Sequence, residues 1–185
     1  MPSLNSIRNR EQPWATLDEL HRASLEKLVV TQGIGGLSSG DLDYIVNGWH
    51  KLSPWPDVIP GLKRLQRKFI TGPLSNGNVS LLVDLAKFGE LPWDMVFGAD
   101  IFEHYKPDRE IYTGVAKLLR VPVDSVMLAA AHNNDLGAAK GFGLMTAFIA
   151  RPTEYGPGQT TDLKPDQNFT YVATSVEDLA QQLGA

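Results

Sequence analysis

The chain has 185 residues, of which 43% are hydrophobic and 21% are charged, and it carries a formal net charge of −4. This length and composition fit a single globular α/β domain with a small insertion, while the negative charge argues against nucleic-acid binding and no apolar run could span a membrane. The absence of cysteine excludes disulfides, thiolate catalysis and zinc–sulfur sites. A cytoplasmic protein is the simplest interpretation, because the first residues lack the basic and apolar regions of a signal peptide.

The first part of the chain predicts two paired helices and no strand. Residues 1–12 are polar, and we expect them to be poorly anchored. Thr16 and Glu19 fit a capping box, and leucines at helical spacing follow until Gly33, a suitable helix stop. A second amphipathic helix follows the Gly/Ser-rich loop 34–40 and ends at the next prolines.

From residue 55 onward, strands and helices alternate. Strands are predicted at 69–74, 95–98, 126–130, 145–150 and 171–173, with helices at 58–68, 79–88, 109–119 (capped by Asp108), 135–140 and after Ser175. This alternation is typical of an α/β fold with a Rossmann-like, mainly parallel sheet that carries helices on both faces. We therefore predict a small helical cap segment, residues 1–54, and an α/β core, residues 55–185.

Polar turns follow two of the predicted strands. The first turn is residues 75–77, a Ser-Asn-Gly sequence, and the second is residues 132–135, a His-Asn-Asn-Asp sequence. Open α/β sheets bind ligands outside the carboxyl ends of their strands, so both turns should face a common pocket. Ser75 and Asn76 could hold an anion at the start of the next helix, although these residue types serve equally well as turn and cap residues.

Lys106 and Asp135 are further candidates for chemistry at this edge of the sheet. Pro107 fixes the backbone beside Lys106, and an ammonium group next to a carboxylate suits chemistry on a small anionic substrate. Taken singly, however, a solvated lysine and a helix-capping aspartate are the more ordinary interpretations. The four histidines lack metal-ligand spacing, so we expect no zinc. There is no phosphate loop or dinucleotide fingerprint, and we predict no cofactor.

Together these motifs resemble the haloacid dehalogenase superfamily, and more narrowly the type II L-2-haloacid dehalogenases. The matching segments are Leu74-Ser75-Asn76-Gly77, Tyr105-Lys106-Pro107 with Tyr112, residues 130–136, and residues 146–156. The likeness runs from about Pro13 to the C-terminus.

The resemblance implies a reaction and a set of roles. In this family an aspartate displaces halide from C2 of a short 2-haloacid, and water then hydrolyses the aspartyl ester without a metal. Ser75 and Asn76 would bind the substrate carboxylate and steady the nucleophile. Lys106 would neutralise the site, and Asp135 would position Lys106 and the hydrolytic water. The residues expected to contact substrate are Tyr112, His132, Asn133 and Trp14.

The sequence also departs from the family pattern. His132 stands where better-known dehalogenases carry asparagine, and Ala130 where they carry serine. The family begins with a strand that ends in the nucleophilic aspartate, and nothing before Trp14 predicts a strand, so we expect an N-terminally truncated member. Neither Arg8 nor Arg10 replaces the cap arginine that helps to bind halide.

Three functions remain open from the sequence. The first is a dehalogenase-type hydrolase, and the second is a magnesium-dependent phosphatase of the same superfamily, whose usual Gly-Asp pair is missing from residues 130–135. The third is a non-catalytic protein that binds an anion or a partner in the retained pocket, and a homodimer is also left open.

In the family the nucleophile strand lies between the strands that correspond to 69–74 and 126–130, so we expect an open slot between these two.

Overall fold

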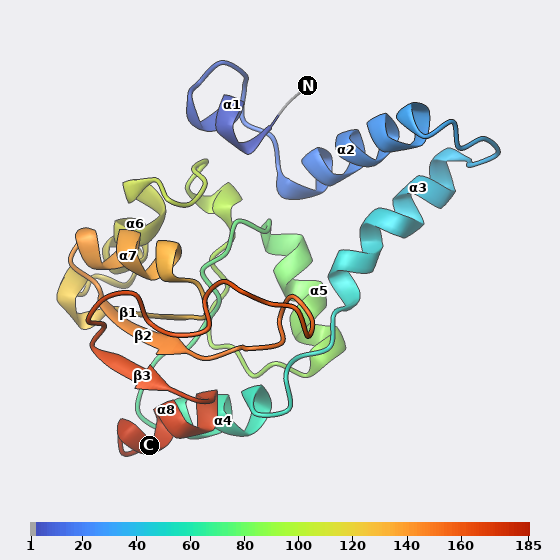
Figure 1. Ribbon diagram of the computed structural model, residues 1–185. Coiled ribbons are helices and arrows are strands. Elements are labelled where there is room, and N and C mark those ends of the chain that lie inside the picture. Colours follow the sequence, from blue (N-terminus) through green and yellow to red (C-terminus); the bar gives the residue numbers. More distant parts are fainter. Residues whose placement is uncertain (1–2) are drawn as a thin grey trace.

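The computed structural model describes residues 3–185, and it consists of an α/β body with two helices that project from it (Figure 1). The first half contains α1 (Leu4–Arg8), α2 (Leu17–Thr31), α3 (Ser39–Val46), the 3-10 helix η1 (Asn47–Lys51), α4 (Val58–Leu65) and α5 (Val79–Gly89). The second half contains η2 (Ala99–Ile101), α6 (Arg109–Leu119), η3 (Val123–Ser125), β1 (Met127–Ala130), α7 (Asn133–Gly141), β2 (Met145–Ile149), β3 (Tyr171–Ala173) and α8 (Val176–Gln182). Within these residues, no helix combines the length and the apolar character needed to cross a membrane.

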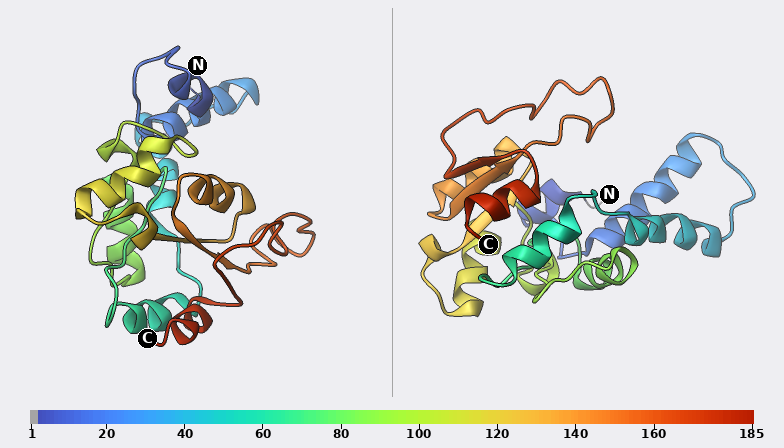
Figure 2. Two further views of the ribbon diagram at one scale, coloured as in Figure 1. Left: turned by 90° about the vertical axis from the view of Figure 1, so that its left-hand side faces the viewer. Right: turned by 90° about the horizontal axis from the view of Figure 1, so that it is seen from below.

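The sheet is parallel and is covered on both faces, as the alternating pattern predicted. Its strand order is β1-β2-β3, with Ala129 opposite Ala147 and Phe148 opposite Val172. Helix α7 packs on one side of the strands, and α8 lies with α4 on the other (Figures 1 and 2). Phe148, in the middle strand, is fully buried in the core. The α/β fold class predicted from the sequence is therefore confirmed.

The first two predicted strands are reduced to a single parallel bridge between Leu74 and Phe97. The Phe97 N–H donates to the Pro73 carbonyl at 3.1 Å, and the Ser75 N–H donates to the Phe97 carbonyl at 3.1 Å. One step further back, the ladder would need an N–H from Pro73 to the Met95 carbonyl, and proline has none. The strand predicted at 69–74 is thus wrong over most of its length, because Pro73 interrupts the pairing.

This bridge and the main sheet remain separate. In the described part of the chain, β1 pairs only with β2, and Leu74 pairs only with Phe97. Leu74 nevertheless packs against the same apolar cluster as Leu128 of β1. The two segments thus share a core without sharing hydrogen bonds, which agrees with the slot expected between them.

The N-terminal segment is anchored, contrary to prediction. Residues 1 and 2 lie outside the described residues, but α1 begins at a Ser3–Ser6 capping box and buries Ile7. Arg8 Nε donates to Asp108 Oδ1 at 2.8 Å. Asp108 is the N-cap residue of α6, but its carboxylate makes no capping hydrogen bond and pairs with Arg8 instead. The polar composition concealed this anchoring because only two apolar residues, Leu4 and Ile7, and one ion pair contribute to it.

The two projecting helices, α2 and α3, meet the body at a polar junction. The predicted capping box of α2 is confirmed, since Thr16 Oγ1 accepts from the Glu19 N–H and the Glu19 carboxylate accepts from the Thr16 N–H. At the junction, the ring of His50 is buried, with Nδ1 2.8 Å from Asp84 of α5 and Nε2 3.2 Å from Asp18 of α2. These contacts join the root of the helix pair to the α/β body.

Mild acid is expected to destabilise the protein through His21. Burial is the main cause that lowers the pKa of His21 below its ordinary value of 6.5, and its buried Nδ1 has no hydrogen-bond partner among residues 3–185. The unfolded chain therefore binds a proton more readily, so stability present above about pH 6.5 is lost as the pH falls. Urea unfolding from about pH 7.5 to about pH 5.5 should show this loss, and His21→Phe should reduce it while keeping the stack on Trp49.

The hydrogen bond from the Thr16 backbone N–H lowers the pKa of Glu19, and this affects stability in a different pH range. A carboxylate with a lowered pKa contributes stability above its ordinary pKa, here 4.5, and loses it below. The two effects are therefore separable. An unchanged pH dependence in His21→Phe between neutral and mildly acidic pH would contradict the assignment to His21.

Candidate active site

Lys106, Asp135 and Tyr112 form a hydrogen-bonded cluster beside the sheet. Lys106 lies in the loop before α6, Tyr112 lies in α6 and Asp135 lies in the first turn of α7. Lys106 Nζ is 2.7 Å from Asp135 Oδ2, and the Tyr112 hydroxyl donates to Asp135 Oδ1 at 2.6 Å. The lysine ammonium also lies 5.8 Å from the centre of the Tyr112 ring. Both oxygens of the aspartate are therefore engaged, one by a cation and one by a neutral donor.

The turn after Leu74 joins this cluster through the backbone of Lys106. Asn76 Oδ1 accepts from the Lys106 N–H at 2.8 Å, and Ser75 Oγ accepts from the Gly77 N–H at 3.0 Å. Ser75 and Asn76 thus lie at the same edge as Lys106 and Asp135, which is the convergence that their positions after strand ends predicted. The structure brings these four predicted site residues together.

Trp14 contacts the site indirectly. Its ring stacks on Tyr105 with the ring centres 4.6 Å apart, and the Tyr105 hydroxyl donates to the Ala15 carbonyl at 2.7 Å. Trp14 therefore packs against the residue that precedes Lys106. It supports the wall of the site from the side of the projecting helices.

The two buried tyrosines remain neutral hydrogen-bond donors. Burial, followed by the hydrogen bond to Asp135, raises the pKa of Tyr112 well above its ordinary value. Burial likewise raises the pKa of Tyr105. The cluster consequently holds one ammonium, one carboxylate and one phenol, an arrangement suited to placing an anion beside Lys106.

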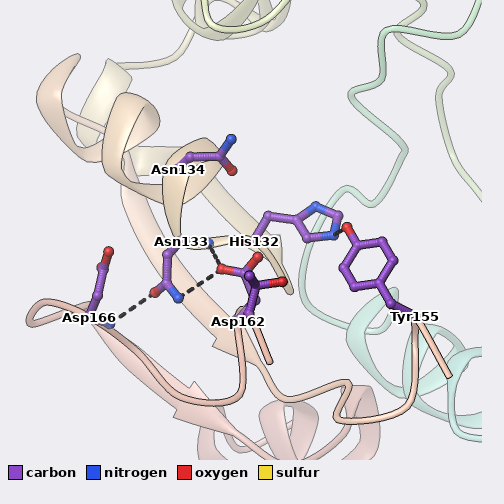
Figure 3. Close-up of a pocket in the computed structure, with 7 residues that line it drawn as sticks. His132, Asn133, Asn134, Tyr155, Asp162 and Asp166 are labelled. Atoms are coloured by element: carbon purple, nitrogen blue, oxygen red, sulfur yellow. Dashed lines mark hydrogen bonds between the residues drawn. The ribbon is translucent and has the colours of Figure 1, made fainter. Parts of the chain in front are cut away.

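The second polar turn borders an open hollow of about 530 Å³ (Figure 3). His132 Nε2 lies 3.1 Å from Glu154 Oε2 and 3.1 Å from the Tyr155 hydroxyl. The residues that line the hollow are His132, Asn133, Asn134, Tyr155, Thr161, Asp162 and Asp166. The hollow therefore lies between the start of α7 and the long loop that follows β2, and its lining includes none of Lys106, Tyr112 and Asp135.

The side chain of Asn133 fastens this loop. Its Nδ2 donates to Asp162 Oδ1 at 2.9 Å and to the Lys164 carbonyl at 3.0 Å, and its Oδ1 accepts from the Asp166 N–H at 3.0 Å. Both ends of the amide are thus engaged by loop residues. Asn133 and its neighbour His132 therefore line the hollow, whereas the contacts of Lys106, Tyr112, Asp135 and Asn76 form a separate cluster. The sequence around Asp162 carried no signal for the contacts of Asn133.

A parallel sheet with a lysine–aspartate pair at one edge is the architecture of a Rossmann-like α/β enzyme. A family model described as haloacid dehalogenase-like hydrolase matches residues 7–143, well over half of the chain. The protein belongs to the haloacid dehalogenase-like hydrolases, and the resemblance read from its motifs is confirmed.

The individual proteins and structures that the chain resembles include several 2-haloacid dehalogenases. The chain is 30% identical over 130 residues to the (S)-2-haloacid dehalogenase of Xanthobacter autotrophicus, which covers 68% of this chain and 51% of that protein. A crystal structure of an L-2-haloacid dehalogenase is 48% identical with a TM-score of 0.95, covering 98% of this chain and 77% of that one. A defluorinating L-2-haloacid dehalogenase is also 48% identical, with a TM-score of 0.96 and coverage of 100% and 76%. The chain spans about half the length of the curated relatives it matches.

Proposed function

We propose that this site serves the hydrolysis of the carbon–halogen bond of short 2-haloacids through an aspartyl-ester intermediate. The observation that carries the proposal is the cluster in which Asp135 accepts from Lys106 and Tyr112 while Asn76 accepts from the Lys106 backbone. The two structures at 48% identity, both of L-2-haloacid dehalogenases, support the choice of substrate class.

The geometry supports specific roles for the clustered residues. Asn76 Oδ1 is occupied by Lys106, but its Nδ2 donates to no other group among residues 3–185, so it is available to the substrate carboxylate. Ser75, whose hydroxyl lies beside Asn76 in the turn, would be the second donor. Lys106 would balance the negative charge of the substrate, and Asp135 would fix Lys106 and orient the hydrolytic water.

The nucleophile in this proposal is an aspartate at the end of a strand between Leu74 and β1. In the described part of the chain, the only carboxylate within ion-pair distance of Lys106 is Asp135, and both of its oxygens are engaged. A carboxylate held in this way is a poor nucleophile. A further strand in the slot would end at the same edge of the sheet, next to Ser75 and Asp135.

Halide release tests this proposal. The 185-residue chain is expected to release no halide from L-2-chloropropionate above background, because no free carboxylate among residues 3–185 lies within ion-pair distance of Lys106. Adding a strand of the family type that ends in aspartate should restore release, and the same strand ending in asparagine is the matched control. Robust turnover by the 185-residue chain, or no turnover by a folded protein with the added aspartate strand, would contradict the proposal. Release of phosphate from p-nitrophenyl phosphate with Mg²⁺ would favour a phosphatase.

We also infer that the protein forms a homodimer. Large apolar side chains are exposed on the projecting helices and η1, and a second copy would cover them: Leu28, Val30, Tyr44, Ile45 and Trp49. Sedimentation at several concentrations tests the dimer.

A further inference from the structure

His132 has two different environments at its two ring nitrogens. Nε2 faces Glu154 Oε2 and the Tyr155 hydroxyl, both at 3.1 Å, whereas Nδ1 makes no hydrogen bond to any of residues 3–185. The rings of His132 and Tyr155 also stack, at an interplanar angle of 25°. Figure 3 shows one ring nitrogen directed at the Tyr155 hydroxyl and the other turned away from it.

The partner at Nε2 determines where the proton lies on a neutral ring. A carboxylate can only accept a hydrogen bond, so the Nε2 that faces Glu154 must carry hydrogen. A neutral imidazole then leaves a lone pair on Nδ1. The Tyr155 hydroxyl could either donate to Nε2 or accept from it, so it does not determine the tautomer. The hydrogen bond to the carboxylate is charge-assisted and therefore the stronger one, so it determines that Nε2 carries the hydrogen.

We propose that Glu154 is a positioning residue that holds His132 in its Nε2–H tautomer, so that Nδ1 accepts a hydrogen bond from the hydrolytic water. The assignment of this water rests on the proposed function, because an ester intermediate requires one. His132 is the N-cap residue of α7 and Asp135 lies in the first turn of the same helix, so a water held by Nδ1 would be bound at the helix end that carries the partner of Lys106. A lone pair attracts an O–H donor and repels a carboxylate.

His132 thereby takes a role different from the one that the resemblance implied. A residue that binds the substrate carboxylate must present a hydrogen, whereas Nδ1 presents a lone pair. We therefore assign His132 to the water and leave the substrate carboxylate to Ser75 and Asn76. The family's asparagine can present either an oxygen or an amide group, but the imidazole here is restricted by Glu154.

Nitrogen NMR of the imidazole rings tests the tautomer directly and requires no dehalogenase activity. On the ¹⁵N-labelled 185-residue protein, at a pH where the ring is neutral, the His132 signals are identified by their loss in His132→Asn. Nε2 is expected to give a protonated-type signal and Nδ1 an unprotonated-type signal. In Glu154→Lys the new ammonium can only donate, so Nε2 should lose its hydrogen and the two signal types should exchange.

Tyr155→Phe is the matched control, because it removes the other neighbour of Nε2 and keeps Glu154. This variant should retain the tautomer of the unsubstituted protein, and unchanged signals of the other histidines would verify the fold of each variant. A hydrogen on Nδ1 in the unsubstituted protein, or no exchange of signals in Glu154→Lys, would overturn the proposal. Since no substrate is used, a failure of the dehalogenase assignment would leave this result intact and distinguishable.

Discussion

Replacing Asp135 with alanine is expected to lower the free energy of unfolding by about 3 kcal/mol. The substitution would leave the Lys106 ammonium without its counter-ion and the Tyr112 hydroxyl without its acceptor. The Lys106 and Asp135 side chains are each 16% exposed, and Tyr112 is fully buried, so water replaces these contacts poorly. Breaking a buried pair by removing one partner costs more than the pair itself contributes, because the other charge remains.

Urea unfolding followed by circular dichroism would measure this loss. Asp124→Ala, in the exposed part of η3, is the matched control and should change stability by less than about 0.5 kcal/mol. The double variant Lys106→Met with Asp135→Ala should recover part of the loss, since no unpaired charge remains. Equal stability of Asp135→Ala and Asp124→Ala would show that the cluster is not held as described.

Replacing Gly98 with alanine should destabilise the protein by about 2–3 kcal/mol. The added Cβ would lie 2.6 Å from the Val79 nitrogen and 2.9 Å from the Asn78 carbonyl carbon, both of which are backbone atoms. It would also collide with Asp100 Oδ1, and this carboxylate accepts from the Val79 N–H at the start of α5. The methyl group would therefore push apart the two segments that place residues 75–77 at the site.

Gly48→Ala provides the comparison for this substitution. A Cβ at Gly48 would meet no atom within 4 Å, so the same chemical change should have little effect on stability. Thermal or urea unfolding of the two variants side by side measures the difference. Similar stabilities would indicate that the approach of Gly98 to the start of α5 is not a tight contact.

The alternation of strands and helices made the α/β fold predictable, because β1, β2 and β3 are short apolar runs bounded by helix caps and turns. The strand predicted at 69–74 failed for a reason visible only with its partner present. Pro73 lies within an apolar run that is typical of a strand. It occupies a position where the Met95 carbonyl of the neighbouring segment requires an N–H donor, which proline lacks. Local patterns identify strands, but pairing decides how far they extend.

The positions of the clustered residues could be predicted from the sequence, but the contacts made by the loop could not. Ser75, Asn76, Lys106 and Asp135 all follow strand ends or precede helices, and the parallel topology brings them together. The contacts of His132 could not be foreseen, because they come from a loop about 20 residues further along whose path no periodic pattern determines. Sequence order fixes which residues reach the edge of a sheet, whereas loops decide which atoms they meet there.

The polar junction at His50 has a mechanical consequence for the projecting helices. Because Nδ1 and Nε2 reach carboxylates on two different elements, directional contacts fix the root of the helix pair to the body. Towards the tip, residues 31–41 are all exposed and lack comparable contacts with the body. The helix pair is thus fixed to the body at its root and free of such contacts at its tip. A partner that binds the tip would therefore transmit force mainly to the contacts of the buried His50.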